Sequence, residues 1–150
     1  MRSRLRTLTV PFGVALAACG GDGGTAPNPT NFGGTWVATR VEYVSVANSG
    51  IKVEIIAQGA SLTVQFNTNG SYASVLTTPG ETPENTTGTW SASADVFTLR
   101  WVEGGFTNEM QFDWTMSGAT LTLVGADSDF DFEGTGELLP AKLSLTLVRQ

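Results

Sequence analysis

The sequence predicts an all-β domain, an antiparallel up-and-down β-barrel of about eight to ten short strands, preceded by a signal peptide and a flexible tether. One pattern occurs twice, at 90–99 and at 114–123: a Trp is followed by a short turn and then by an apolar-Thr-Leu strand. Turn signals recur about every 8–12 residues, and no stretch has the length and periodicity of an ordinary helix. No long connection returns across the sheet, so a closed barrel is favoured over a sandwich, because closure removes exposed edges.

The first 18 residues have the features of an export signal. Arg2, Arg4 and Arg6 precede an apolar run over 7–18. This run is too short to span a bilayer, which takes about 20 residues, but it has the length of the apolar part of a signal peptide. The segment Leu16-Ala17-Ala18-Cys19 resembles the cleavage motif of bacterial lipoprotein signals. That resemblance implies cleavage before Cys19, a diacylglycerol on its thiol, and anchoring by acyl chains such as palmitate.

The residues after Cys19 indicate where in the cell the protein is located. In lipoproteins of bacteria with two membranes, an Asp after the Cys retains the protein in the inner membrane. Gly20 stands there instead, so the resemblance implies an outer-membrane lipoprotein, either periplasmic or exposed at the surface. We expect 19–32, rich in Gly and Pro, to form the lipidated Cys and a tether to a domain at 33–150. The alternative is an ordinary secretory signal, which would leave Cys19 as a free thiol.

Alternation of apolar and polar residues places the first strands of the domain. We expect strands at 33–44, 61–66 and 72–76, and a weaker one at 51–57, whose alternation is broken at Ile56. Asn69-Gly70 predicts a type I′ hairpin turn, in which both central residues have positive φ. Residues 78–85 contain two prolines, and we expect a loop in which Glu81 and Glu84 are solvated.

The second half contains the longest expected strand, 106–116, and a closing strand at 141–149 with its leucines facing inward. Between them, 127–133 alternates acidic and aromatic residues, which predicts a strand with the acids facing solvent. This row lacks the Gly and the acid that an EF-hand loop has at its sixth and twelfth positions. We therefore expect no metal site, although the sequence leaves a weak surface Ca²⁺ site open at Asp127, Asp129 and Asp131.

The domain resembles bacterial lipocalin-like proteins. The resemblance is carried by Gly34-Thr35-Trp36, by the two Trp hairpins and by the final segment 145–149. It implies an up-and-down barrel that holds a small ligand, with a Trp of the first strand packed under an Arg of the last. Strand parity indicates the same pair, because the first and last strands of a closed, even-numbered meander are antiparallel neighbours. We expect the Arg149 guanidinium within about 6 Å of the Trp36 ring centroid.

Seven aromatic residues are candidates for a ligand cavity: Phe66, Tyr72, Trp90, Phe97, Trp101, Phe112 and Trp114. An eight-stranded barrel is just wide enough to be filled by side chains or to hold one small ligand, so these residues either line a cavity or fill it. Two functions follow. One is binding of a small, neutral, apolar molecule, since the expected inward set carries no charge. The other is a structural or protein-interaction module of the cell surface with a filled core.

Composition argues against several other classes of protein. The chain has no His, and its single Cys is at position 19, so the usual general base, Ser-His hydrolysis and an intrachain disulfide are all missing. Removal of the three N-terminal arginines takes the net charge from −6 to −9, which disfavours nucleic acid as a partner. We expect no enzymatic activity, no cofactor, and a monomer whose partners are a membrane, through Cys19, and a small apolar ligand.

Overall fold

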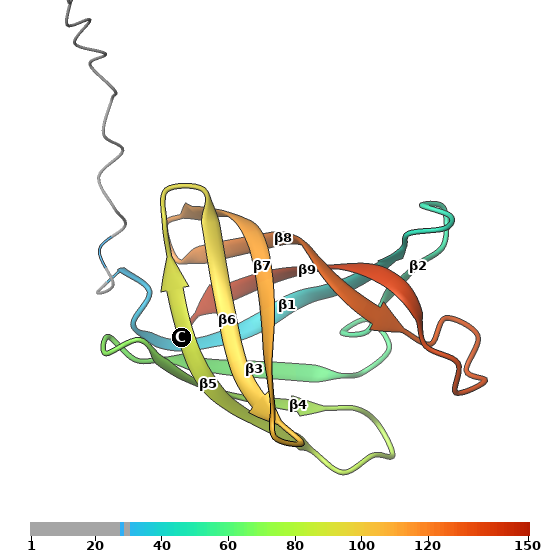
Figure 1. The fold of residues 1–150 in the computed structure, drawn as a ribbon. Helices are drawn as coiled ribbons and strands as arrows, with labels where there is room; N and C mark the ends of the chain where they lie inside the picture. Colours follow the sequence, from blue (N-terminus) through green and yellow to red (C-terminus); the bar gives the residue numbers. More distant parts are fainter. Residues whose placement is uncertain (1–27, 29–30) are drawn as a thin grey trace, which may run out of the picture.

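The computed structural model describes residues 28 and 31–150, and these form an all-β domain without an α-helix (Figure 1). Its strands are β1 (Gly34–Ser45), β2 (Lys52–Glu54), β3 (Ser61–Phe66), β4 (Ser71–Thr77), β5 (Glu84–Ala92), β6 (Val96–Glu103), β7 (Phe106–Ser117), β8 (Thr120–Phe130) and β9 (Leu139–Arg149). All neighbours are antiparallel, and eight strands close into a barrel with β2 as an additional strand. The predicted up-and-down barrel is confirmed. In this part of the chain no helix is long and apolar enough to cross a membrane.

The first strand closes the barrel. One edge of β1 pairs with β3 near its start and with β2 near its end, and the other edge pairs with β9 along most of its length. Trp36 is the register partner of Arg149. Cζ of Arg149 lies 4.7 Å from the centroid of the Trp36 ring, and its Nη2 donates a hydrogen bond to the carbonyl of Asn31. The closing contact that strand parity indicates is therefore present.

The barrel has two different ends. At one, which we call the plugged end, β1, β4, β6 and β8 begin; at the other, the open end, they finish. Phe32 fills the plugged end and is 1% exposed. Its ring centroid lies 5.2 Å from those of Trp90 and Trp114 and 5.4 Å from that of Phe97. The expectation that the tether includes Phe32 is wrong, because this side chain belongs to the core.

The repeated Trp has a structural role at the plugged end. Nε1 of Trp90 donates to the carbonyl of Asn67, 3.0 Å away in the β3–β4 turn. Nε1 of Trp114 donates to the carbonyl of Ser93, 2.9 Å away in the β5–β6 turn. Each indole therefore holds the turn of the preceding hairpin, which satisfies both the indole donor and a turn carbonyl. Trp36 likewise holds the segment that precedes β1, since its Nε1 donates to the carbonyl of Phe32 over 2.8 Å.

The β3–β4 hairpin is where the sequence places it, but its turn is of another type. Among the described residues, only glycines have positive φ, so Asn69 does not, whereas Gly70 has a φ of 84°. The N–H of Gly70 donates to the carbonyl of Asn67, and the N–H of Asn67 donates to that of Ser71. A turn with a single left-handed residue just before the return strand matches a type I turn with a bulge. The predicted type I′ turn is therefore wrong.

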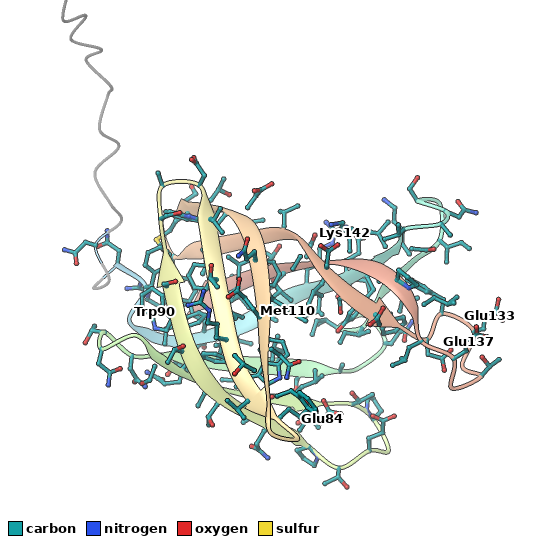
Figure 2. All side chains as sticks on the ribbon, viewed as in Figure 1. Glu84, Trp90, Met110, Glu133, Glu137 and Lys142 are labelled. Atoms are coloured by element: carbon teal, nitrogen blue, oxygen red, sulfur yellow. The ribbon has the colours of Figure 1, made fainter. Side chains whose placement is uncertain are left out.

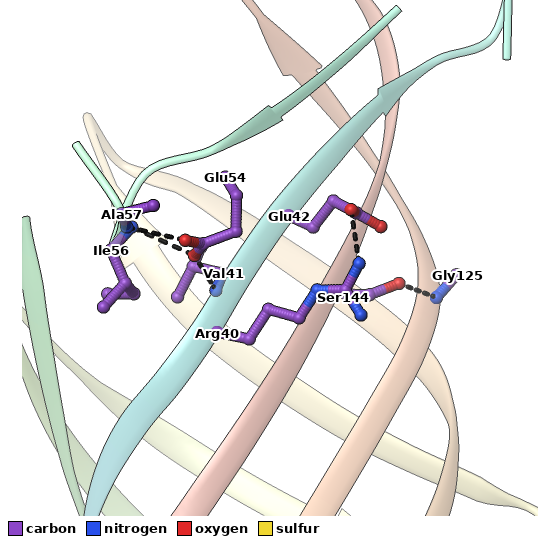
Figure 3. A network of polar contacts seen from close by, with 8 residues as sticks. All are labelled: Arg40, Val41, Glu42, Glu54, Ile56, Ala57, Gly125 and Ser144. Carbon is purple, nitrogen blue, oxygen red and sulfur yellow. Dashed lines mark hydrogen bonds and ion pairs between the residues drawn. The ribbon is translucent and has the colours of Figure 1, made fainter. Parts of the chain in front are cut away.

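Glu54 joins the turn after β2 to the barrel wall (Figure 3). Its Oε1 accepts hydrogen bonds from the N–H groups of Val41 and Ile56 at 2.9 and 3.0 Å, and its Oε2 accepts one from that of Ala57 at 2.6 Å. Burial acts to raise the pKa of this carboxyl, but the three donors and the charge of Arg40 outweigh it, so the pKa of Glu54 is lowered. The carboxylate thus satisfies backbone donors where β1 changes its partner from β3 to β2. The weak strand expected at 51–57 is confined to Lys52–Glu54, because the N–H groups of Ile56 and Ala57 donate to the Glu54 carboxylate in the turn that follows.

Candidate functional site

A pocket of about 610 Å³ lies in the open end of the barrel. Apolar side chains from four strands line its inner part: Leu62, Val64, Leu99, Met110 and Leu145. Figure 2 shows Trp90 and Glu84 toward opposite ends of β5, and Met110 on β7. The barrel interior is therefore filled at the plugged end and hollow at the open end.

The pocket exists because the inward residues become smaller and more polar along each strand. On β5 the inward series, from the plugged end to the open end, is Trp90, Gly88, Thr86 and Glu84. Its register partners on β4 run from Tyr72 through Ser74 to Leu76. Strand alternation points all of these to one face, so the loss of aromatic volume after Trp90 and Tyr72 leaves space that the opposite wall does not fill.

Gly88 lies at the step between the filled and the hollow half. A Cβ atom built there would lie 1.9 Å from the carbonyl oxygen of Arg100 and 2.8 Å from Cε1 of Tyr72. No other residue fits, because one of these atoms belongs to the backbone of β6. Tyr72 and Trp101 are the register partners of Gly88 on either side, and both rings line the pocket.

The lining of the pocket has two carboxylates, Glu84 and Glu103, and no Lys or Arg. The expectation that the inward set carries no charge is therefore wrong for these described residues. It failed because β5 begins at Glu84, within the expected loop, and Glu84 faces the same side as Thr86. Burial, and then the charge of Glu84, raise the pKa of the Tyr43 phenol on β1, so the field of this carboxylate extends into the open end.

The seven aromatic candidates divide between the two halves of the barrel. Tyr72 and Trp101 line the pocket, and burial raises the pKa of the Tyr72 phenol. Four others are core residues: Phe66, Trp90, Phe97 and Phe112. Trp90 stacks on Phe97 with centroids 5.6 Å apart and planes 6° apart, and Trp114 packs on Phe32. Cys19 lies outside the described residues.

The acidic row does not form one strand face. β8 ends at Phe130, so Asp131 and Glu133 lie in the following loop, where a strand was expected. Asp127 is ion-paired with Lys142, with 2.6 Å between Oδ1 and Nζ. Asp131 accepts hydrogen bonds from backbone N–H groups of the loop, which lower the pKa of its carboxyl. In the described part of the chain, no three His, Cys, Asp or Glu residues are grouped as a metal site would need.

Sequence reasoning missed most of the pocket wall. Leu62, Leu99 and Met110 lie in strands that the sequence predicts, but none of them was among the cavity candidates. Ser74 and Thr86 were not candidates either. Only the inward residues of several strands taken together could have indicated the pocket. Comparison of inward residues strand by strand would have shown aromatic groups gathered toward one end.

No protein-family model matches the chain, and no curated protein or solved structure matches it significantly either.

Proposed function

We propose that the protein is a lipid-anchored, lipocalin-like binding protein of the cell envelope, which holds a small apolar molecule in the open end of its barrel. The pocket carries this proposal: it combines an apolar inner part with a few polar groups at the rim, as small-molecule sites usually do. Its volume of about 610 Å³ falls within the range of about 300–1,000 Å³ that is typical of such sites. Binding is preferred over catalysis, because the chain has no His and no nucleophile paired with a base lines the pocket.

The second candidate is a structural or protein-interaction module of the cell surface. The filled plugged end favours it, since the core around Phe32 and Phe97 is built of packed side chains alone. Val102 and Phe106, both largely exposed near the β6–β7 turn, offer an apolar contact for another protein. The two candidates differ in one measurable property, which is saturable binding in the pocket.

Binding should be detectable with N-phenyl-1-naphthylamine, a neutral apolar fluorophore, titrated into the full chain carrying Cys19→Ser. We expect saturable enhancement of probe emission, with quenching of Trp emission. Ser74→Phe adds a ring to the pocket lining and should weaken the probe by about tenfold, which corresponds to about 1.4 kcal/mol. The matched control, Ser91→Phe, lies on the outward register of β5 and should leave the affinity unchanged. If the titration does not saturate, the binding proposal fails and the structural module remains.

The anchor is tested separately by fractionation and intact mass. We expect the wild-type chain in the membrane fraction, cleaved before Cys19 and heavier by its acyl groups. Cys19→Ser should be released into the soluble fraction without added lipid, because two or more acyl chains are enough for stable attachment and none would remain. A soluble wild-type product with an unmodified Cys19 thiol would contradict the anchor, whatever the pocket binds.

A further inference from the structure

The charged side chains at the rim of the pocket are all acidic. Glu84, at the start of β5, and Glu103, at the end of β6, both line it. The only Lys or Arg on β4 to β7 is Arg100, and it pairs with Glu109, with 2.5 Å between Nε and Oε2. Lys142, on β9, pairs with Asp127. A ligand in the pocket therefore meets two carboxylates and no fixed positive charge.

An aromatic ring lies beside these carboxylates. Trp101 lines the pocket, and its Nε1 is 3.4 Å from Oε2 of Glu103, at the long end of the hydrogen-bond range. Tyr72 contributes a second ring deeper in the barrel. A carboxylate next to an indole is a combination that attracts cations in two ways, through charge and through the negative face of the ring. Below it, Leu99 and Met110 provide an apolar surface for a hydrocarbon chain.

We propose that the pocket selects cationic amphiphiles, organic ammonium ions that carry an apolar chain. This inference rests on the proposed function and narrows it to a ligand class. The ammonium group lies at the rim, between Glu84, Glu103 and the Trp101 ring, and the chain extends toward Leu99 and Met110.

The same geometry disfavours fatty acids and other apolar anions. A carboxylate ligand would lose part of its hydration at the rim and gain no cation in exchange, while it faces two like charges. The field of the whole domain acts in the same direction, because residues 33–150 carry thirteen Asp and Glu against five Lys and Arg, a net charge of −8. Such a field raises the local concentration of cations at the pocket and speeds their association.

The test compares three ligands with the same chain length: octyltrimethylammonium, 1-octanol and octyl sulfate. Each is titrated calorimetrically, below its micellar concentration, into the full chain carrying Cys19→Ser. We expect octyltrimethylammonium to bind about tenfold more tightly than 1-octanol, and octyl sulfate to bind more weakly than 1-octanol. The advantage of the cation should shrink as NaCl is raised, because charges at an exposed rim are screened by salt.

The variant that assigns the effect is Glu84→Gln combined with Glu103→Gln. It keeps the shape of both side chains, and it should lower the affinity for octyltrimethylammonium about tenfold while the affinity for 1-octanol stays the same. The matched control, Asp95→Asn with Asp113→Asn, removes two charges from near the plugged end, where β6 begins. It should leave most of the preference for the cation intact.

The outcomes separate this inference from the function on which it rests. If 1-octanol binds as tightly as octyltrimethylammonium, the cation preference is refuted and the apolar binding protein stands. The cation preference is also refuted if the cation binds more tightly but the two control substitutions reduce its affinity as much as the two rim substitutions do. If none of the three ligands binds, both the inference and the proposed function fail.

Discussion

Replacing Trp36 with alanine is expected to lower the free energy of unfolding by about 3–5 kcal/mol, the usual cost of removing a large aromatic side chain from a core. The Trp36 side chain is fully buried at the start of the strand that closes the barrel. The substitution leaves a cavity beneath Arg149, and it deprives the carbonyl of Phe32 of the hydrogen bond from the indole. Far-UV circular dichroism during urea unfolding of the full chain measures this loss without depending on Trp emission.

Two further variants show whether the loss of stability in Trp36→Ala comes from the cavity in the packed core. Arg149→Ala leaves Trp36 in place but removes the stacked guanidinium and its hydrogen bond to the carbonyl of Asn31. Loss of the stacking contact should cost about 0.5–2 kcal/mol. Trp101→Ala removes an indole from a pocket that is already open, so no closed cavity forms and the cost should be well below that of Trp36→Ala. If Trp36→Ala and Trp101→Ala destabilise the protein equally, the plugged end is not packed as described.

Replacing Phe32 with alanine is expected to have an effect of the same size, about 3–5 kcal/mol. This residue precedes the first strand, yet its ring contacts Trp90, Phe97 and Trp114, which come from three different strands. Its removal should therefore loosen the aromatic core and not only the chain entry. Urea unfolding again gives the free energy, and near-UV circular dichroism reports the packing of the rings.

Phe106→Ala is the matched control, because the same side chain there is 76% exposed. A substitution at such a surface position should change the free energy of unfolding by no more than about 0.5 kcal/mol. If Phe32→Ala and Phe106→Ala change the free energy of unfolding equally, Phe32 is not a core residue. The domain would then begin at residue 33, as the sequence predicts.

The parts of the fold that followed from the sequence are those set by strand periodicity. Alternation in 61–66, 106–116 and 141–149 identified inward faces that the structure confirms. The pairing of Trp36 with Arg149 follows from the parity of a closed antiparallel meander, so it could be predicted from the sequence. These inferences succeed because every second residue of a half-buried strand faces the core, so the burial pattern is visible in the sequence itself.

The parts that did not follow depend on contacts between distant segments. Phe32 stands alone before two glycines, and no local pattern distinguishes a core plug from a tether residue. Glu84 follows Pro83 in a stretch rich in turn residues, so only its register with Leu76 shows that it begins a strand and lines the pocket. The pocket itself reflects a gradient of side-chain size around several strands, which no single strand reveals.

The closure of the barrel by its first and last strands has a consequence for how the chain folds. From β3 to β9 each strand pairs with the next through a hairpin, so most of the sheet can form from neighbours in the sequence. The β1–β9 ladder joins segments far apart in the sequence. The side-chain hydrogen bond from Thr39 Oγ1 to the carbonyl of Thr146, 107 positions away, links the same two strands. Contacts of such long range carry the largest loop-closure entropy and make folding slow. A chain that lacks β9 would therefore keep β1 and β8 as unpaired edges, which are templates for aggregation.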